Sequence, residues 1–319
     1  MADPSASPTQ AWPSLPLEAW ADTCATLHLW TQVVGKVRLA CSPWVNHSWH
    51  VVLYGTARGL TTSPIPHGPR TFQLDFDFID HQLLLQSSDG RNASFALQPQ
   101  SVADFYCRVM NRLDDLKLHV EIDRYPNEVA DPVRFDRDEV HRAYDRMYAA
   151  RYWRALVQAD RVFERFRARY VGKCSPVHYF WGAADLAVTR FSGCVAPPHP
   201  GGIPHLPDWI TRDAYSHEVS SCGFWAGGGP VPHPAFYSYA YPEPPGFAEA
   251  TVRPDAAFYH RELREFLLPY DAVRTAPDPD ATLLDFLQST YEAAADLGGW
   301  DRQFVEAAGD IRSGRSHSR

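Results

Sequence analysis

The chain has 319 residues, and its 30 Lys and Arg residues stand against 38 Asp and Glu residues, which gives a formal net charge of −8. A composition with 45% hydrophobic and 21% charged residues excludes a wholly disordered protein. The mild acidity argues against a protein that binds nucleic acid or an anionic membrane surface. The sequence shows neither an apolar run long enough to cross a membrane nor a signal peptide, so we expect a cytoplasmic protein. The candidate site residues described below lead us to expect a small-molecule ligand as its partner.

The first part of the chain predicts a helix, several strands and a second helix. An amphipathic helix that ends at Gly35-Lys36 is predicted by apolar residues at near-helical spacing, namely Trp20, Leu27, Trp30 and Val34. Apolar and aromatic runs predict strands at 51–54, 72–79, 83–85 and 94–97, with a hairpin turn at 87–90. A helix over 101–116 closes this part.

The second part predicts the same order after a connector at 121–137. Its opening helix is indicated by Leu156, Phe163, Phe166 and Tyr170, and its closing helix covers 280–297. An insertion at 194–245 is rich in proline, glycine and aromatic residues, and this aromatic content predicts a packed segment rather than a linker. The polar ends, 1–12 and 302–319, are expected to be flexible tails.

The two parts share a residue pattern that indicates an internal duplication. The first copy runs Val34-Gly35-Lys36, Ser42-Pro43, His47 and Arg58, and the second runs Val171-Gly172-Lys173, Ser175-Pro176, His178 and Arg190. A gapless match between 102–116 and 283–297 supports the same alignment. We therefore predict an α+β fold of two helix–antiparallel-sheet–helix units, 13–120 and 138–301, related by a pseudo-twofold axis.

Several long stretches resemble a bacterial domain family without an assigned activity. They are LHLWTQVVGK at 27–36, NHSWH at 46–50, ARGLTTSPIP at 57–66, VGKCSPVHYFW at 171–181, PPHPGGIP at 197–204 and AYSHEVSS at 214–221. The resemblance covers nearly all of 12–301 and implies a bacterial protein of the same architecture. It implies no reaction and no catalytic residue.

The pair His217-Glu218 in the insertion is the first candidate for chemistry. It is not a zincin motif, because Ser221 stands where the second histidine would be. His217 and either His199 or His205 could nevertheless bind a divalent transition metal together with a carboxylate. The alternative is that His217 forms a hydrogen bond within an ordered loop.

Matching residues of the two copies supply further candidates. His47 and His178 could meet between the units as catalytic groups, or each could serve the structure of its own unit. Arg58 and Arg190 could hold an anionic substrate, because arginine binds carboxylates and phosphates through two parallel hydrogen bonds. The alternative is that each arginine pairs with a carboxylate on a nearby strand.

These candidates lead to one functional hypothesis and one alternative. We expect an enzyme that acts on a small polar or anionic metabolite in a pocket between the two units, by histidine acid–base chemistry or with a divalent transition metal. The expected catalytic residues are His217, Glu218, His47 and His178, and the expected substrate-binding residues are Arg58, Arg190, Trp49 and Trp225. The alternative is a non-catalytic module that binds a small molecule or another protein.

Overall fold

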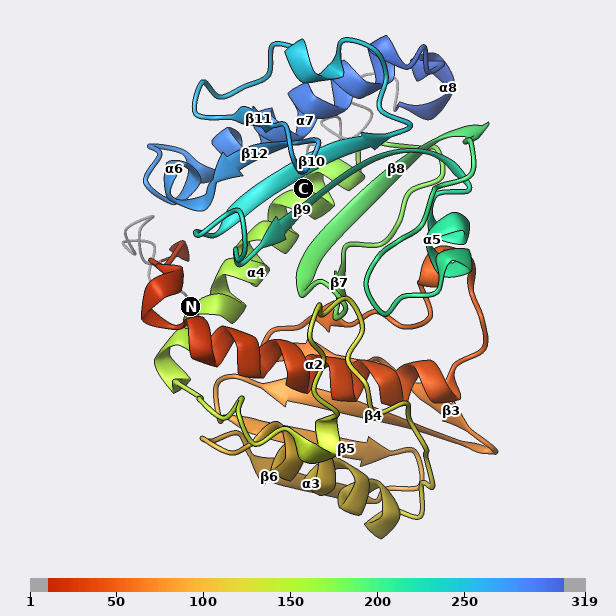
Figure 1. Ribbon diagram of the computed structural model, residues 1–319, viewed down its shortest axis with the longest axis vertical. Coiled ribbons are helices and arrows are strands. Elements are labelled where there is room, and N and C mark those ends of the chain that lie inside the picture. Colours follow the sequence, from red (N-terminus) through yellow and green to blue (C-terminus); the bar gives the residue numbers. More distant parts are fainter. Residues whose placement is uncertain (1–10, 307–319) are drawn as a thin grey trace, which may run out of the picture.

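A computed structural model of the protein describes residues 11–306 (Figure 1). The chain forms two antiparallel sheets, and helices pack against each of them, so the expected α+β class is confirmed. The N-terminal part lies at the bottom of Figure 1 and the C-terminal part at the top. None of the described helices is both long enough and apolar enough to span a membrane.

The first sheet contains the strands predicted between 72 and 97. Its strands are β1 Tyr54–Gly55, β2 Gly59–Thr61, β3 Ile65–His67, β4 Arg70–Asp77, β5 Gln82–Ser87 and β6 Asn92–Ala96. They follow the order β1-β2-β4-β5-β6, and β3 pairs with β4. Helix α3 (Val102–Asp115) begins where the Ser101 side chain accepts a hydrogen bond from the Asp104 N–H, and its Phe105 stacks on Phe76 of β4.

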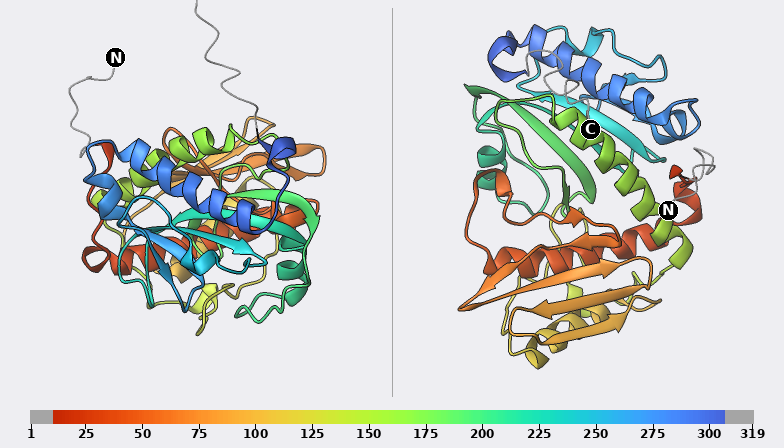
Figure 2. Two further views of the ribbon diagram at one scale, coloured as in Figure 1. Left: turned by 90° about the horizontal axis from the view of Figure 1, so that it is seen from above. Right: turned by 180° about the vertical axis from the view of Figure 1, so that it is seen from behind.

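The second sheet belongs to the C-terminal part. Its strands are β7 His178–Phe180, β8 Asp185–Val195, β9 His217–Trp225, β10 Ala235–Tyr241, β11 Phe258–His260 and β12 Glu265–Pro269, in the order β11-β12-β10-β9-β8-β7. Helices α4 (Arg146–Arg167) and α7 (Pro279–Leu297) cover one face of this sheet (Figure 2). The shorter helices are η1 Leu17–Ala19, η2 Asn46–Ser48, η3 Phe135–Arg137, α5 Asp208–Ala214, η4 Phe247–Glu249, α6 Tyr270–Arg274 and α8 Arg302–Val305.

Helix α2 (Ala21–Cys41) is longer and more deeply buried than the sequence predicts. Every residue from Leu29 to Arg38 is buried, so the helix has no exposed face there and is not simply amphipathic. The helix does not end at Gly35. Glycine is required there because a Cβ atom would lie 2.2 Å from Cδ1 of Trp181, whose ring packs against the helix backbone.

Hydrogen bonds join the two parts of the chain and tie the connector to the first part. Leu53 and Tyr179 exchange two backbone hydrogen bonds of 2.9 and 2.8 Å, which connects the start of the first sheet to the edge strand of the second. Gln32 of α2 accepts a hydrogen bond from the Asn127 N–H and donates one to the Asn127 carbonyl. The predicted connector is therefore held against the central helix.

The insertion 194–245 contains α5, β9 and all of β10. The residues of the expected tails that lie next to the folded part are held in place rather than flexible. Trp12 is a core residue with 2% exposure, and Arg302 forms ion pairs with Asp296 and Glu306. Residues 1–10 and 307–319 lie outside the described part of the chain.

The residues aligned as a repeat lie in different kinds of structure. Val34-Gly35-Lys36 is inside α2, whereas Val171-Gly172-Lys173 follows the end of α4. His47 is in the η2 turn and His178 in β7.

Candidate functional site

The second sheet has one face that helices cover and one face that is rich in tyrosine. Arg190, Phe224 and Phe236 contact aromatic residues of α4, so their side chains point to the helices. Because side chains alternate along a strand, the neighbours of these residues point the other way. We call this second side the tyrosine face, which carries Asp185, Ala187, Thr189, Ser221, Gly223, Trp225, Tyr237, Tyr239 and Tyr241.

Asp185 and Tyr237 form the centre of the tyrosine face. The Tyr237 hydroxyl donates a hydrogen bond to Oδ2 of Asp185, which is buried with 8% exposure. The phenol crosses Gly223 on the strand between them, and a Cβ atom at Gly223 would lie 2.4 Å from the Tyr237 hydroxyl. Burial raises the pKa of Asp185 to about 6, although the bond from Tyr237 acts in the opposite direction.

Two glutamates act electrostatically on this centre from other segments. Glu128 belongs to the connector, and its carboxylate packs so closely on Gly182 that a Cβ atom there would lie 1.9 Å from Oε1. Glu265 begins β12. Burial, and then the negative charge of Asp185, raises the pKa of Glu128 and of Glu265 to about 7.

More aromatic residues extend the tyrosine face along β10. The rings of Tyr237 and Tyr239 stack with centroids 6.1 Å apart, and the hydroxyl groups of Tyr215 and Tyr239 are 2.8 Å apart. His199 of the insertion stacks on Tyr215 at 4.7 Å. Burial raises the pKa of Tyr239 to about 12. These tyrosines therefore stay protonated at neutral pH and act as hydrogen-bond donors as well as apolar surfaces.

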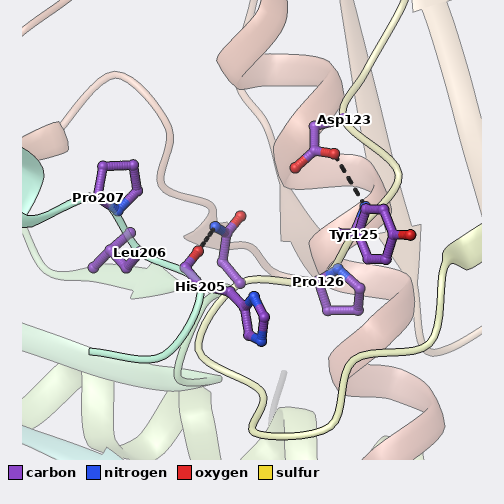
Figure 3. Close-up of a pocket in the computed structure, with 7 residues that line it drawn as sticks. Asp123, Tyr125, Pro126, His205, Leu206 and Pro207 are labelled. Carbon is purple, nitrogen blue, oxygen red and sulfur yellow. Dashed lines mark hydrogen bonds between the residues drawn. The ribbon is translucent and has the colours of Figure 1, made fainter. Parts of the chain in front are cut away.

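A cavity of about 440 Å³ opens beside the connector (Figure 3). It is lined by Asp123, Tyr125, Pro126 and Asn127 on one side and by His205, Leu206 and Pro207 on the other. The next residue of the connector, Glu128, donates a backbone hydrogen bond of 3.0 Å to the Pro204 carbonyl. The connector, which carries Glu128, thus also lines this cavity.

His178 lies in one row across the sheet with Ala187, Gly223 and Tyr237, on the tyrosine face. Its side chain is 1% exposed, and neither ring nitrogen has a hydrogen-bond partner within the described residues. Burial lowers the pKa of His178 to about 4, so the ring is neutral at pH 7.

His47 and His217 approach each other near the far end of β8, where their ring centroids are 6.3 Å apart. Trp49 packs against Phe191 there, with centroids 6.0 Å apart, and Nζ of Lys173 lies 2.5 Å from Nε2 of His47. The structure therefore brings together two of the expected catalytic histidines and one expected substrate-binding tryptophan. The lysine was not among the expected residues.

The structure does not bring the expected arginines and Glu218 to these residues. Arg190 is buried on the helix-covered face, where its guanidinium lies 3.4 Å from the centroid of Phe166. Arg58 is half-exposed on the first sheet and pairs with Asp77 and Asp80, as the structural alternative expected. Glu218 accepts a hydrogen bond from Ser192 and alternates with His217 along β9, so the two side chains point to opposite faces.

The described residues show no metal centre. Between 11 and 306, no three His, Cys, Asp or Glu side chains lie close enough together to hold an ion. His199, one expected ligand, accepts a hydrogen bond from the Gly201 N–H through Nδ1, and His217 contacts the Ser216 hydroxyl through Nδ1.

Sequence reasoning missed Asp185, Glu128 and Glu265. One signal was available for the tyrosines, because Tyr237, Tyr239 and Tyr241 alternate with small residues and so share one face of a strand. The carboxyl groups come from three distant segments, and no local pattern links them.

The fold and the site define an α+β protein with an acidic, tyrosine-lined sheet face. The chain belongs to a family of unknown function (DUF5996), whose model matches residues 12–307. This membership confirms the resemblance seen in the sequence. A search of curated proteins and of solved structures found no match.

Proposed function

We propose that the protein binds a small, positively charged organic molecule on the tyrosine face and acts on it by proton transfer through Asp185 and Tyr237. The observation that carries this proposal is the hydrogen-bonded Asp185–Tyr237 pair with two further carboxyl groups beside it. Within residues 11–306, none of these three carboxyl groups forms an ion pair with a lysine, an arginine or a histidine.

Electrostatics favour a cationic ligand. All three carboxyl groups are desolvated, and the negative charge of Asp185 also acts on Glu128 and Glu265, so their pKa values are raised toward neutrality. A bound cation would remove the repulsion and lower these pKa values, so binding would release protons. An anionic ligand would meet the opposite field, and Arg58 and Arg190, the residues expected to hold it, lie elsewhere.

The side chains around the acids suit an organic cation. Trp225 is in register with Asp185 on the neighbouring strand, and the stacked rings of Tyr237 and Tyr239 lie on the same face. Aromatic faces attract ammonium and guanidinium groups. Buried polar groups are normally hydrogen-bonded, so the two nitrogens of His178, which have no partner among the described residues, support a bound polar molecule on this face.

Proton transfer is the chemistry that Asp185 suits. An acid with a pKa of about 6 exchanges protons readily near neutral pH. The Tyr237 hydroxyl would orient Asp185 and stabilise its carboxylate after the proton leaves. The alternative, binding without catalysis, would use the same lining, and loss of turnover without loss of binding in Tyr237→Phe would distinguish the two.

Thermal unfolding with a matched panel of molecules tests the proposal. Putrescine, agmatine and choline should raise the Tm at pH 7.5, whereas 1,4-butanediol and succinate should not. A ligand at one hundred times its Kd stabilises the folded state by about 2.7 kcal/mol, which gives a shift of several degrees. The stabilisation should weaken at pH 5, where the carboxyl groups are protonated.

Two variants locate the effect. Asp185→Asn keeps the size of the side chain and should abolish the shift, whereas Asp75→Asn on the first sheet should retain it. If no cation in the panel raises the Tm, or if Asp185→Asn responds as the wild type does, the proposal is wrong.

The order long helix, antiparallel sheet, helix in both parts supports a common origin. We propose that 13–120 and 138–301 descend from one such unit, are related by a pseudo-twofold axis and are joined by the connector 121–137. A relative that folds with a single unit would test this descent. The proposed location is the cytoplasm, which fractionation of the source cells would test.

A further inference from the structure

Lysine is rare in this chain, and one lysine has an unusual partner. The chain has only three lysines, Lys36, Lys117 and Lys173, and all the other residues in its Lys and Arg count are arginines. Lys36 is buried and pairs with Asp123 at 3.0 Å. Lys117 is exposed. Lys173 instead contacts a histidine, with Nζ 2.5 Å from Nε2 of His47.

Aromatic rings hold the Lys173 side chain in place. Its Nζ lies 4.8 Å from the ring centroid of Phe191 and 5.7 Å from that of Trp49. The Lys173 carbonyl accepts a hydrogen bond of 3.0 Å from the Phe191 N–H, which ties its backbone to β8. The residue as a whole remains exposed, so a molecule from solution can reach it.

The orientation of His47 makes it a proton acceptor toward Lys173. Its Nδ1 lies 3.1 Å from the Ala214 carbonyl, which can only accept, so Nδ1 carries the hydrogen. In the neutral ring Nε2 is then unprotonated and faces the lysine. The His47 N–H also donates a hydrogen bond of 2.6 Å to Asp213, and these contacts hold the residue at a φ of 59°.

Burial, rather than the neighbouring charges, favours an uncharged amine at Lys173. Burial lowers the pKa of Lys173, and the negative charge of Asp213 offsets this only in part. Burial, and then the positive charge of Lys173, lowers the pKa of His47. The ring of His217 is the other titratable group at this point, and it too lowers the pKa of His47.

We propose that Lys173 is a reactive amine that forms an imine with a small aldehyde or ketone, with His47 as its base. His47 Nε2 takes a proton from the Lys173 ammonium, and the freed lone pair attacks the carbonyl carbon. The resulting carbinolamine takes the proton back on its hydroxyl group and loses water, which leaves a C=N bond. The flat faces of Trp49 and Phe191 favour an unsaturated or aromatic carbonyl compound. This site is separate from the Asp185 centre and does not depend on the function proposed there.

Reductive trapping tests the proposal. The folded protein is treated briefly with pyridoxal and sodium cyanoborohydride at pH 7, and the modified lysines are identified by peptide mapping. We expect Lys173 to be modified several-fold faster than Lys117, because a lowered pKa leaves more of its amine uncharged and nucleophilic at pH 7. In urea the two lysines should react at equal rates.

His47→Gln should slow the modification of Lys173 toward the rate of Lys117, whereas His119→Gln, a change at an exposed histidine, should not. If His47→Gln fails to fold, the pH dependence of the modification rate in the wild type tests the proposal instead. The pH at which this rate is half-maximal should be lower for Lys173 than for Lys117. Equal rates for Lys173 and Lys117 in the folded wild type, equal midpoints, or an unchanged rate in folded His47→Gln would each overturn the proposal.

Discussion

The hydroxyl of Tyr237 reaches over Gly223 of the neighbouring strand to donate its hydrogen bond to Asp185 on the strand beyond. The central residue of this row must lack a side chain, because the phenol occupies the place where a Cβ atom would be. A glycine inside a strand, rather than in a turn, thus determines whether the acid and its partner can meet.

Gly223→Ala should separate the two and destabilise the protein. The new methyl group would lie 2.4 Å from the Tyr237 ring and 2.5 Å from the Leu186 carbonyl, so both the side chain and the strand must move. We expect a loss of about 2 to 3 kcal/mol in the free energy of unfolding, measured by urea denaturation. Gly55→Ala is the control, because its nearest neighbour is 3.9 Å away; a similar loss in both variants would contradict this account.

Glu265 and Glu128 should make the protein less stable as the pH rises. Their folded pKa of about 7 lies above the unfolded value of 4.5, so their stabilising effect is complete below pH 4.5 and is lost as the pH passes through 7. Glu265→Gln removes one such group and should reduce the fall in stability between pH 5 and pH 8 by about 1 to 2 kcal/mol. Urea titrations of both proteins at the two pH values measure it, and parallel curves would count against the raised pKa.

His178 should make the protein sensitive to acid. Its folded pKa of about 4 lies below the unfolded value of 6.5, so its contribution is present above pH 6.5 and is lost as the pH falls toward 4. The loss amounts to about 3 kcal/mol. His178→Leu removes the titrating ring and its unpartnered nitrogens, so it should unfold at lower pH than the wild type without loss of stability at pH 8. Unfolding curves against pH, followed by circular dichroism, would show an unchanged midpoint if His178 plays no part.

Replacement of Arg190 should reduce the stability of the protein more than replacement of Arg58, the other arginine expected to bind substrate. Arg190→Ala removes a buried side chain that stacks on Phe166 and lies 4.2 Å from the ring centroid of Tyr291, and we expect a loss of about 3 kcal/mol. Arg58→Ala should cost far less, because the side chain is exposed and Asp77 keeps the backbone N–H groups of Ile79 and Asp80 as partners. Equal losses in urea denaturation would show that Arg190 is not the structural residue described here.

Local signals in the sequence were sufficient for several elements. Helix α3 matches the predicted 101–116 and α7 matches 280–297. Ser101 caps the first turn of α3 through its side chain, and Asp278 caps that of α7. β4 lies within the predicted strand 72–79, and its Leu74 and Phe76, two residues apart, both point into the core. These properties depend on residues within one or two turns or along one strand, so they can be read from the chain directly.

The sequence determined the α+β class, the family membership and most of the long elements, because periodicity and capping act between near neighbours. Only the tertiary structure decided where the chemistry lies. Asp185 and Tyr237 are 52 residues apart, and His47 and Lys173 are 126 residues apart. Sheet register and the course of the connector bring such residues together, and these depend on packing across the whole molecule. The same packing allows α2 to continue as a buried helix beyond Gly35. It also places Arg190 among the aromatic rings of α4 and α7.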